Sequence, residues 1–97
     1  MKLLNIVHCK RCGANIKVPV LTIEQKIQLR RLKNDGKILN AVDQVKHFVG
    51  YDLKEAKALV LHINDQGHCN RCDFDYLQGE NVICPKCQAF NLNWESN

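Results

Sequence analysis

Hydrophobic residues in the central part of the chain recur at the spacing of amphipathic helices. Two successive stripes follow the i, i+3, i+4, i+7 rule; the first is Ile38, Ala41, Val42, Val45, Phe48 and Val49, and the second is Leu53, Ala56, Leu59, Val60 and Ile63. Gly50 lies between the stripes and is expected to end the first helix in the left-handed conformation. Asp52 and Glu55 form a capping pair at the start of the second helix.

A further helix is predicted before these two. Thr22 and Gln25 form a capping-box pattern at its start, and Asn34-Asp35-Gly36 supplies a stop signal. Residues 21–64 are therefore predicted to form a segment of three short helices.

The residues after position 68 show the alternation that is typical of β-strands. Residues 90–94 alternate between apolar and polar side chains, which predicts a strand with Asn91 and Asn93 on its polar face. Residues 74–76 alternate in the same way, and residues 78–81 are a turn candidate before the next apolar pair. Together with the helical middle, this pattern predicts an α+β fold.

Length and composition suggest that hydrophobic burial needs a supplement. The chain has 97 residues, of which 45% are hydrophobic and only 6% aromatic. A multidomain enzyme is excluded at this length, and a small core usually requires disulfides or a metal. The six cysteines are the candidates for this role.

Four of the cysteines have the spacing of a structural zinc site. Cys69 and Cys72 are separated by two residues, as are Cys84 and Cys87, and eleven residues lie between the pairs. Two such knuckles can complete the tetrahedral shell of one zinc ion. The first residues are too short a stretch for a secretory signal, and no run is long enough to cross a membrane, so we expect a cytoplasmic protein in which thiols bind metal rather than form disulfides.

Residues 68–94 resemble the zinc-ribbon family, including the Cys84-Pro85-Lys86-Cys87 knuckle and the alternating strand after it. The resemblance implies β-hairpins that carry one zinc ion. Many ribbons have glycine directly after each knuckle, whereas this chain has Asp73 and Gln88, which predicts strain in those turns. The predicted fold is thus a small α+β zinc-binding protein, with three helices between its cysteine-bearing ends.

Cys9 and Cys12 form a third knuckle, followed by Gly13, without an obvious second half. Three interpretations stay open. The pair completes a zinc site with Cys69/Cys72 or Cys84/Cys87, binds a second zinc ion with a histidine such as His8, His62 or His68, or binds no metal. For His62, the simplest interpretation is a favourable interaction with the C-terminal end of the third helix.

The predicted helical hairpin resembles that of the C-terminal domain of the bacterial ribosomal stalk protein. The likeness covers residues 37–60, and its core is Gly50-Tyr51-Asp52-Leu53-Lys54-Glu55-Ala56-Lys57. In that family the hairpin recruits translational GTPases through basic surface residues, although Asp43 here occupies a position that is usually basic. The resemblance implies a protein partner, such as a translation factor or ribosome component, with Lys46, Lys54 and Lys57 as candidate contacts.

Charge suggests an alternative partner. The net charge is +4, and residues 1–20 carry four basic side chains and no acidic one, whereas residues 65–97 carry two basic and five acidic side chains. A nucleic acid would therefore contact the first two thirds of the chain. The candidate phosphate contacts are Lys10, Arg11, Lys17, Arg30 and Arg31.

No familiar catalytic motif is visible in the sequence, so we do not expect an enzyme. We predict three regions: an N-terminal knuckle (1–20), a helical segment (21–64) and a C-terminal zinc ribbon (65–97). The expected function is that of a non-enzymatic zinc-binding adaptor or protein-interaction module, with nucleic-acid binding as the alternative.

Overall fold

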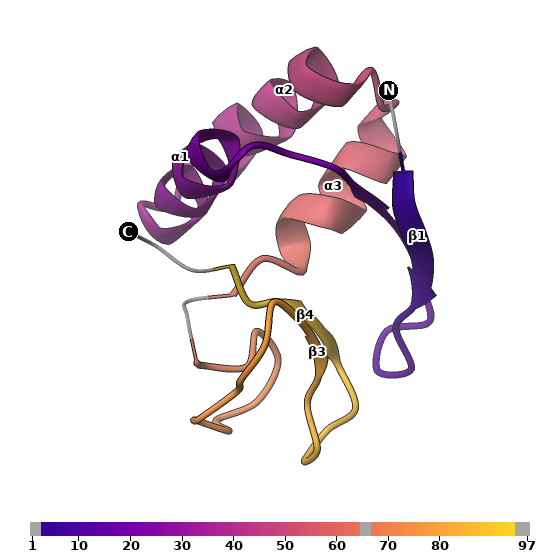
Figure 1. The fold of residues 1–97 in the computed structure, drawn as a ribbon, viewed down its shortest axis with the longest axis vertical. Helices are drawn as coiled ribbons and strands as arrows, with labels where there is room; N and C mark the ends of the chain where they lie inside the picture. Colours follow the sequence, from indigo (N-terminus) through magenta and orange to yellow (C-terminus); the bar gives the residue numbers. More distant parts are fainter. Residues whose placement is uncertain (1–2, 65–66, 95–97) are drawn as a thin grey trace.

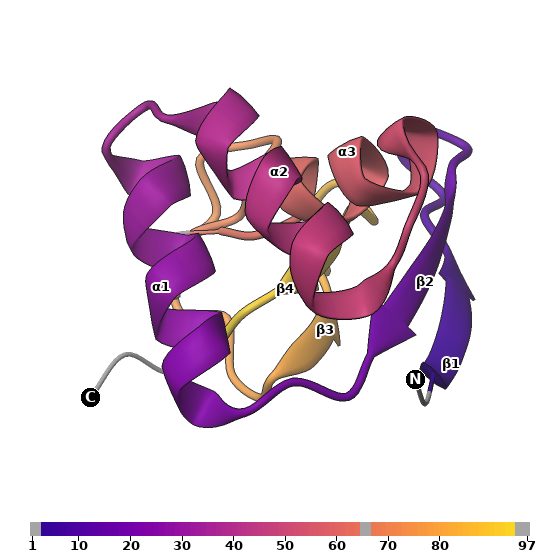
Figure 2. The same ribbon diagram turned by 90° about the horizontal axis from the view of Figure 1, so that it is seen from above.

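The computed structural model describes residues 3–64 and 67–94. Three helices lie above a small C-terminal hairpin, and an N-terminal hairpin stands beside the helices (Figures 1 and 2). The elements in chain order are β1 (Leu3–His8), β2 (Asn15–Pro19), α1 (Ile23–Asn34), α2 (Ile38–Val49), α3 (Leu53–Leu61), β3 (Asn81–Ile83) and β4 (Phe90–Leu92). The α+β class and the three helices predicted from the sequence are confirmed.

The helix ends follow from local side-chain chemistry. Thr22 and Asp52 each accept a hydrogen bond from the backbone three residues later, and both capping boxes are complete. Gly50 ends α2 with φ 71°, a conformation that costs a residue with a Cβ atom about 1–2 kcal/mol. α3 ends at Leu61, so Ile63 lies beyond the helix and forms a parallel bridge with Leu92.

The N-terminal hairpin was not predicted as such. β1 and β2 pair antiparallel, and residues 9–14 form the loop between them. β2 is held to the turn between α2 and α3 by the Tyr51 hydroxyl, which donates to the carbonyl of Lys17 at 2.8 Å. Burial in this contact raises the pKa of Tyr51 to about 12, so the phenol stays protonated. The hairpin thus positions its loop against α3.

The C-terminal region differs from the sequence prediction in two respects. Residues 74–76 form no strand, and Tyr76 is 82% exposed with φ 75°. β4 has no solvent-facing polar side, because Asn91 and Asn93 are both buried. The polar face that the alternation predicts is buried, because these amides replace the hydrogen bonds that a longer sheet would supply.

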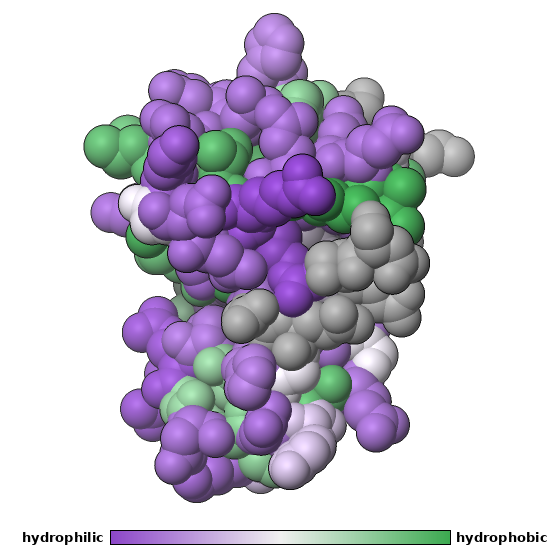
Figure 3. All heavy atoms as spheres, turned by 90° about the vertical axis from the view of Figure 1, so that its left-hand side faces the viewer, coloured by the Kyte–Doolittle hydropathy of each residue, from purple (hydrophilic) through white to green (hydrophobic). Residues whose placement is uncertain are grey.

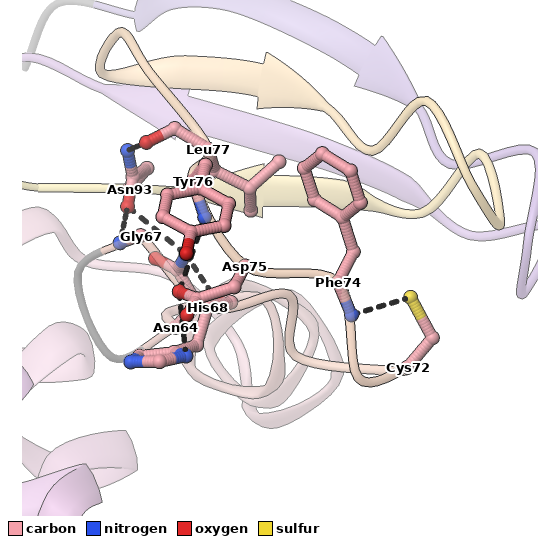
Figure 4. A network of polar contacts seen from close by, with 9 residues as sticks. All are labelled: Asn64, Gly67, His68, Cys72, Phe74, Asp75, Tyr76, Leu77 and Asn93. Atoms are coloured by element: carbon pink, nitrogen blue, oxygen red, sulfur yellow. Dashed lines mark hydrogen bonds and ion pairs between the residues drawn. The ribbon is translucent and has the colours of Figure 1, made fainter.

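Asn93 shows how such an amide works (Figure 4). Its Oδ1 accepts from the backbone N–H of Gly67 at 2.7 Å and from the amide of Asn64 at 3.0 Å. Its Nδ2 donates to the carbonyls of Leu77 and Gly79, at 3.1 and 2.9 Å. A single buried side chain therefore holds a loop that lacks regular backbone pairing.

Buried apolar residues form one continuous cluster that draws on all three regions of the chain. Ile16 and Val18 come from β2, Leu59 and Val60 from α3, and Trp94 from beyond β4. The face that carries α1 is mostly hydrophilic, with hydrophobic side chains in small separate patches (Figure 3). No helix in the described part of the chain is long and apolar enough to span a membrane.

The replacement Asn93→Asp tests the amide network. It should lower the free energy of unfolding by at least about 3 kcal/mol, because the carbonyls of Leu77 and Gly79 lose their donor and a buried carboxylate replaces it. Asn81→Asp is the matched control on the exposed start of β3, and should stay within about 0.5 kcal/mol of the parent protein. Chemical denaturation of both metal-loaded variants measures the difference, and equal effects would contradict the assigned role.

Candidate metal centres

Cys69, Cys72, Cys84 and Cys87 come together as their spacing predicts. Their Sγ atoms all lie within 4.8 Å of one another, and the pairs Cys69–Cys87 and Cys72–Cys84 are each 3.6 Å apart. A disulfide requires about 2.05 Å. Four sulfurs at about 2.3 Å from a zinc ion in tetrahedral geometry lie about 3.8 Å from one another. The donor set therefore fits a zinc ion and is compatible with a zinc ribbon.

The three cysteine loops share one backbone geometry. In each, the N–H of the first cysteine donates to the carbonyl five residues later: Cys9 to Ala14 and Cys84 to Ala89 at 2.8 Å, and Cys69 to Phe74 at 3.0 Å. Backbone N–H groups then point at the sulfurs, from Arg71 to Cys69 and from Lys86 to Cys84, each at 3.4 Å. The N-terminal loop is thus built like the two loops of the four-cysteine group.

The four thiols cannot all ionise without a cation. Burial raises the pKa of Cys69, but the N–H groups of Arg71 and Cys72 and the amide of Asn91 outweigh it and lower that pKa to about 6. Burial and the neighbouring thiols raise the pKa of Cys87 to about 12. A divalent cation would stabilise every thiolate at once and displace the remaining protons.

Cys9 and Cys12 form a second group with His62, again with all ligand atoms within 4.8 Å of one another. His62 Nε2 lies 3.3 Å from Cys12 Sγ, while Nδ1 donates to the carbonyl of Ala58 at 2.6 Å. This hydrogen bond leaves the lone pair of Nε2 facing the thiols, which is the usual arrangement of a metal-bound histidine. Burial also lowers the pKa of His62, which favours the neutral ring.

The structure distinguishes the interpretations of the N-terminal knuckle. The backbone N–H of Phe90 donates to Cys9 Sγ at 3.4 Å, so the knuckle touches β4, but its sulfurs group with His62 rather than with the other four cysteines. Two other histidines have different neighbours: His8 contacts Asn15, and His68 contacts Asp75 at 3.0 Å. The sequence pattern at the end of the third helix does not indicate that His62 points inward, because this orientation depends on the contact with Cys12, 50 residues away.

Comparison of the chain with protein-family models, with curated proteins and with solved structures gives no match. The likeness of residues 37–60 to the ribosomal stalk hairpin thus stays a prediction.

The candidate phosphate contacts are not equally accessible. Arg30 is only 7% exposed, and its Nη1 donates to the carbonyl of Trp94 at 3.0 Å, which removes it from the surface. Lys17 forms an ion pair with Glu55, and this hydrogen bond raises the pKa of the lysine. The other three, Lys10, Arg11 and Arg31, are exposed.

The lysines of the predicted hairpin surface are all exposed, at Lys46 on α2 and at Lys54 and Lys57 on α3. Lys54 and Lys57 line a groove between α3 and the N-terminal knuckle, together with Arg71. Lys46 is not among the residues that line this groove.

Gln88 provides a test of knuckle strain. It has φ 67°, whereas Asp73 is not among the described residues with positive φ. Gln88→Gly should therefore raise the free energy of unfolding of the metal-loaded protein by about 1 kcal/mol, because glycine adopts this conformation without a Cβ penalty. Asp73→Gly, the control, should lower it, because glycine only adds freedom to the unfolded chain there. Stabilisation by both changes would contradict the assignment.

Cys84→Ser tests the four-cysteine centre. The variant should lose about one equivalent of zinc and unfold residues 67–94, because short strands and loops cannot fold there on apolar burial alone. Metal analysis and circular dichroism measure both effects. Lys86→Ser, in the same knuckle but without a ligand atom, should keep the metal. Full metal content with an intact fold in Cys84→Ser would refute the centre.

Proposed function

We propose that the protein is a non-enzymatic, zinc-stabilised adaptor that binds a protein partner through the groove between α3 and the N-terminal knuckle. The observation that carries this proposal is the charge of the groove. Three basic side chains, Lys54, Lys57 and Arg71, line the part of the groove around Leu61, which has no acidic residue. The adjoining hollow beside Asn15 also carries Asp52 and Glu55, and Glu55 is paired with Lys17. Ala58 and Leu61 form part of its apolar floor.

An acidic segment of a partner protein fits these features. Lysines and an arginine attract carboxylates and steer their approach, while the apolar residues between them provide burial. The resemblance of residues 37–60 to the ribosomal stalk hairpin supports a partner among translation factors or ribosome components. We place this activity in the cytoplasm, where reduced cysteines are retained.

Nucleic-acid binding is the second candidate, supported by the exposed side chains of Lys10 and Arg11 on the knuckle and Arg31 on α1. It is weaker than the sequence suggested because two of the five candidate contacts are engaged within the protein. Duplex binding through phosphates would weaken steeply with salt, with a log–log slope of about −0.9 per contact.

A double charge reversal distinguishes these functions. Lys54→Glu with Lys57→Glu should weaken capture of an acidic protein partner from native cells at least about tenfold, because two attractive charges become repulsive. Arg31→Glu with Lys37→Glu changes the net charge equally at exposed positions outside the groove and should leave capture intact.

Quantitative capture at two salt concentrations, with a labelled DNA duplex titrated in parallel, provides the measurement. Equal loss of partner in both double variants would refute the groove. Tight duplex binding that the Arg31/Lys37 variant abolishes would favour the nucleic-acid function instead.

A further inference from the structure

The N-terminal knuckle has the structure of a metal-binding loop, although only one ligand from elsewhere in the described residues, His62, lies beside it. Cys9 is fully buried, and the N–H group of Phe90 points at its sulfur. A buried sulfur that accepts a hydrogen bond from a backbone N–H group is suited to be a thiolate, and a buried thiolate needs a cation.

His62 is prepared for the same cation. Its ring is 2% exposed, its Nδ1 is occupied by the carbonyl of Ala58, and its Nε2 faces Cys12. The backbone carbonyl of His62 accepts from the N–H of Leu92 at 2.8 Å, which fixes the end of α3 against β4. Two thiolates and one imidazole are a recurring ligand set for zinc, and zinc takes a fourth ligand.

The structure shows on which side of the group a fourth ligand could bind. Within residues 3–64 and 67–94, no further histidine, cysteine or carboxylate belongs to the group. Cys9 and His62 are buried, whereas Cys12 is exposed and lines the groove with Lys54, Lys57 and Arg71. The accessible side of the cluster therefore opens into the basic groove.

Charge favours an anion at this position. A zinc ion with two thiolates and a neutral imidazole has no net charge, so one added anion leaves a single negative charge beside three basic side chains. A water ligand for catalysis would also need a base. The carboxylates of the adjoining hollow, Asp52 and Glu55, are engaged in the cap of α3, and Glu55 is also paired with Lys17. The surroundings are thus built to hold an anionic oxygen ligand rather than to activate water.

We propose that Cys9, Cys12 and His62 bind a second zinc ion whose fourth coordination position, open to the groove, takes a carboxylate. The carboxylate belongs either to a small acid or to a glutamate or aspartate of the partner, and the second source rests on the proposed function. Zinc accepts carboxylate oxygen at about 2.0–2.2 Å, and Arg71 can pair with the other oxygen.

Metal content and thiol reactivity test the zinc ion. The protein should bind two equivalents of zinc, while Cys12→Ser and His62→Gln should bind one and the control His8→Gln two. With the four-cysteine centre filled by one equivalent of zinc, a second equivalent should slow alkylation of Cys12 by N-ethylmaleimide in the parent protein at least tenfold. This second readout needs no substitution in the core. A single bound equivalent in excess zinc, with Cys12 alkylated at the same rate at one equivalent and in excess zinc, would overturn the proposal.

Cobalt substitution tests the open position. The difference between the absorption spectra of the parent protein and Cys12→Ser isolates the second ion, and acetate should shift this difference spectrum saturably. Lys54→Gln with Lys57→Gln should raise the apparent dissociation constant for acetate about tenfold at unchanged metal content, whereas Lys46→Gln should not. A difference spectrum indifferent to acetate and to a glutamate peptide would show that protein fills the fourth position and would overturn the open site.

A blocked Gly-Glu-Gly peptide distinguishes the two sources. Binding at least tenfold tighter than that of acetate supports a partner side chain, and equal affinity supports a small acid; either result upholds the open position. Failure of the adaptor function would leave these spectra unchanged, because they require only metal, acetate and peptide.

Discussion

The mutual repulsion of closely placed thiolates is the constraint on which the C-terminal half depends. Sulfur atoms 3.6 Å apart cannot all be charged unless a cation lies between them. β3 and β4 have only three residues each, so backbone pairing alone would not hold the loops that carry these sulfurs. Metal coordination by the four sulfurs would supply the cohesion that a larger sheet or core otherwise provides.

The end of α3 transmits this order to the rest of the molecule. The residues directly after α3, His62 and Ile63, pair with Leu92 of β4. The ammonium group of Lys33 on α1 donates to the carbonyl of Ile63. Desolvation lowers the pKa of Lys33, yet its ammonium group also donates to the carbonyl of Leu61, which the end of α3 leaves free. Helices, hairpins and both candidate metal groups therefore meet around one helix terminus.

Local features could be predicted from the sequence, and distant pairings could not. The capping boxes at Thr22 and Asp52 and the left-handed Gly50 depend on neighbours within a few residues, and all three are confirmed. The grouping of Cys69, Cys72, Cys84 and Cys87 follows from their spacing in the same way.

The roles of Asn93, Arg30 and His62 depend instead on partners 14 to 64 residues away. A polar residue in a strand pattern indicates exposure only where the strand belongs to a sheet with a solvent face. Here the strand is so short that its amides pair with loops, and alternation gives the wrong environment for them.

The 50-residue separation of Cys12 and His62 also bears on the unfolded chain. A bond from each to a common metal ion would close a covalent-like loop around all three helices. By the chain-entropy relation for cross-links, closing a loop of that length lowers the conformational entropy of the unfolded ensemble. The loss raises the free energy of the unfolded state by about 4 kcal/mol. The N-terminal knuckle would thus stabilise the helical layer without adding any contact to it, because the unfolded chain would have fewer accessible conformations.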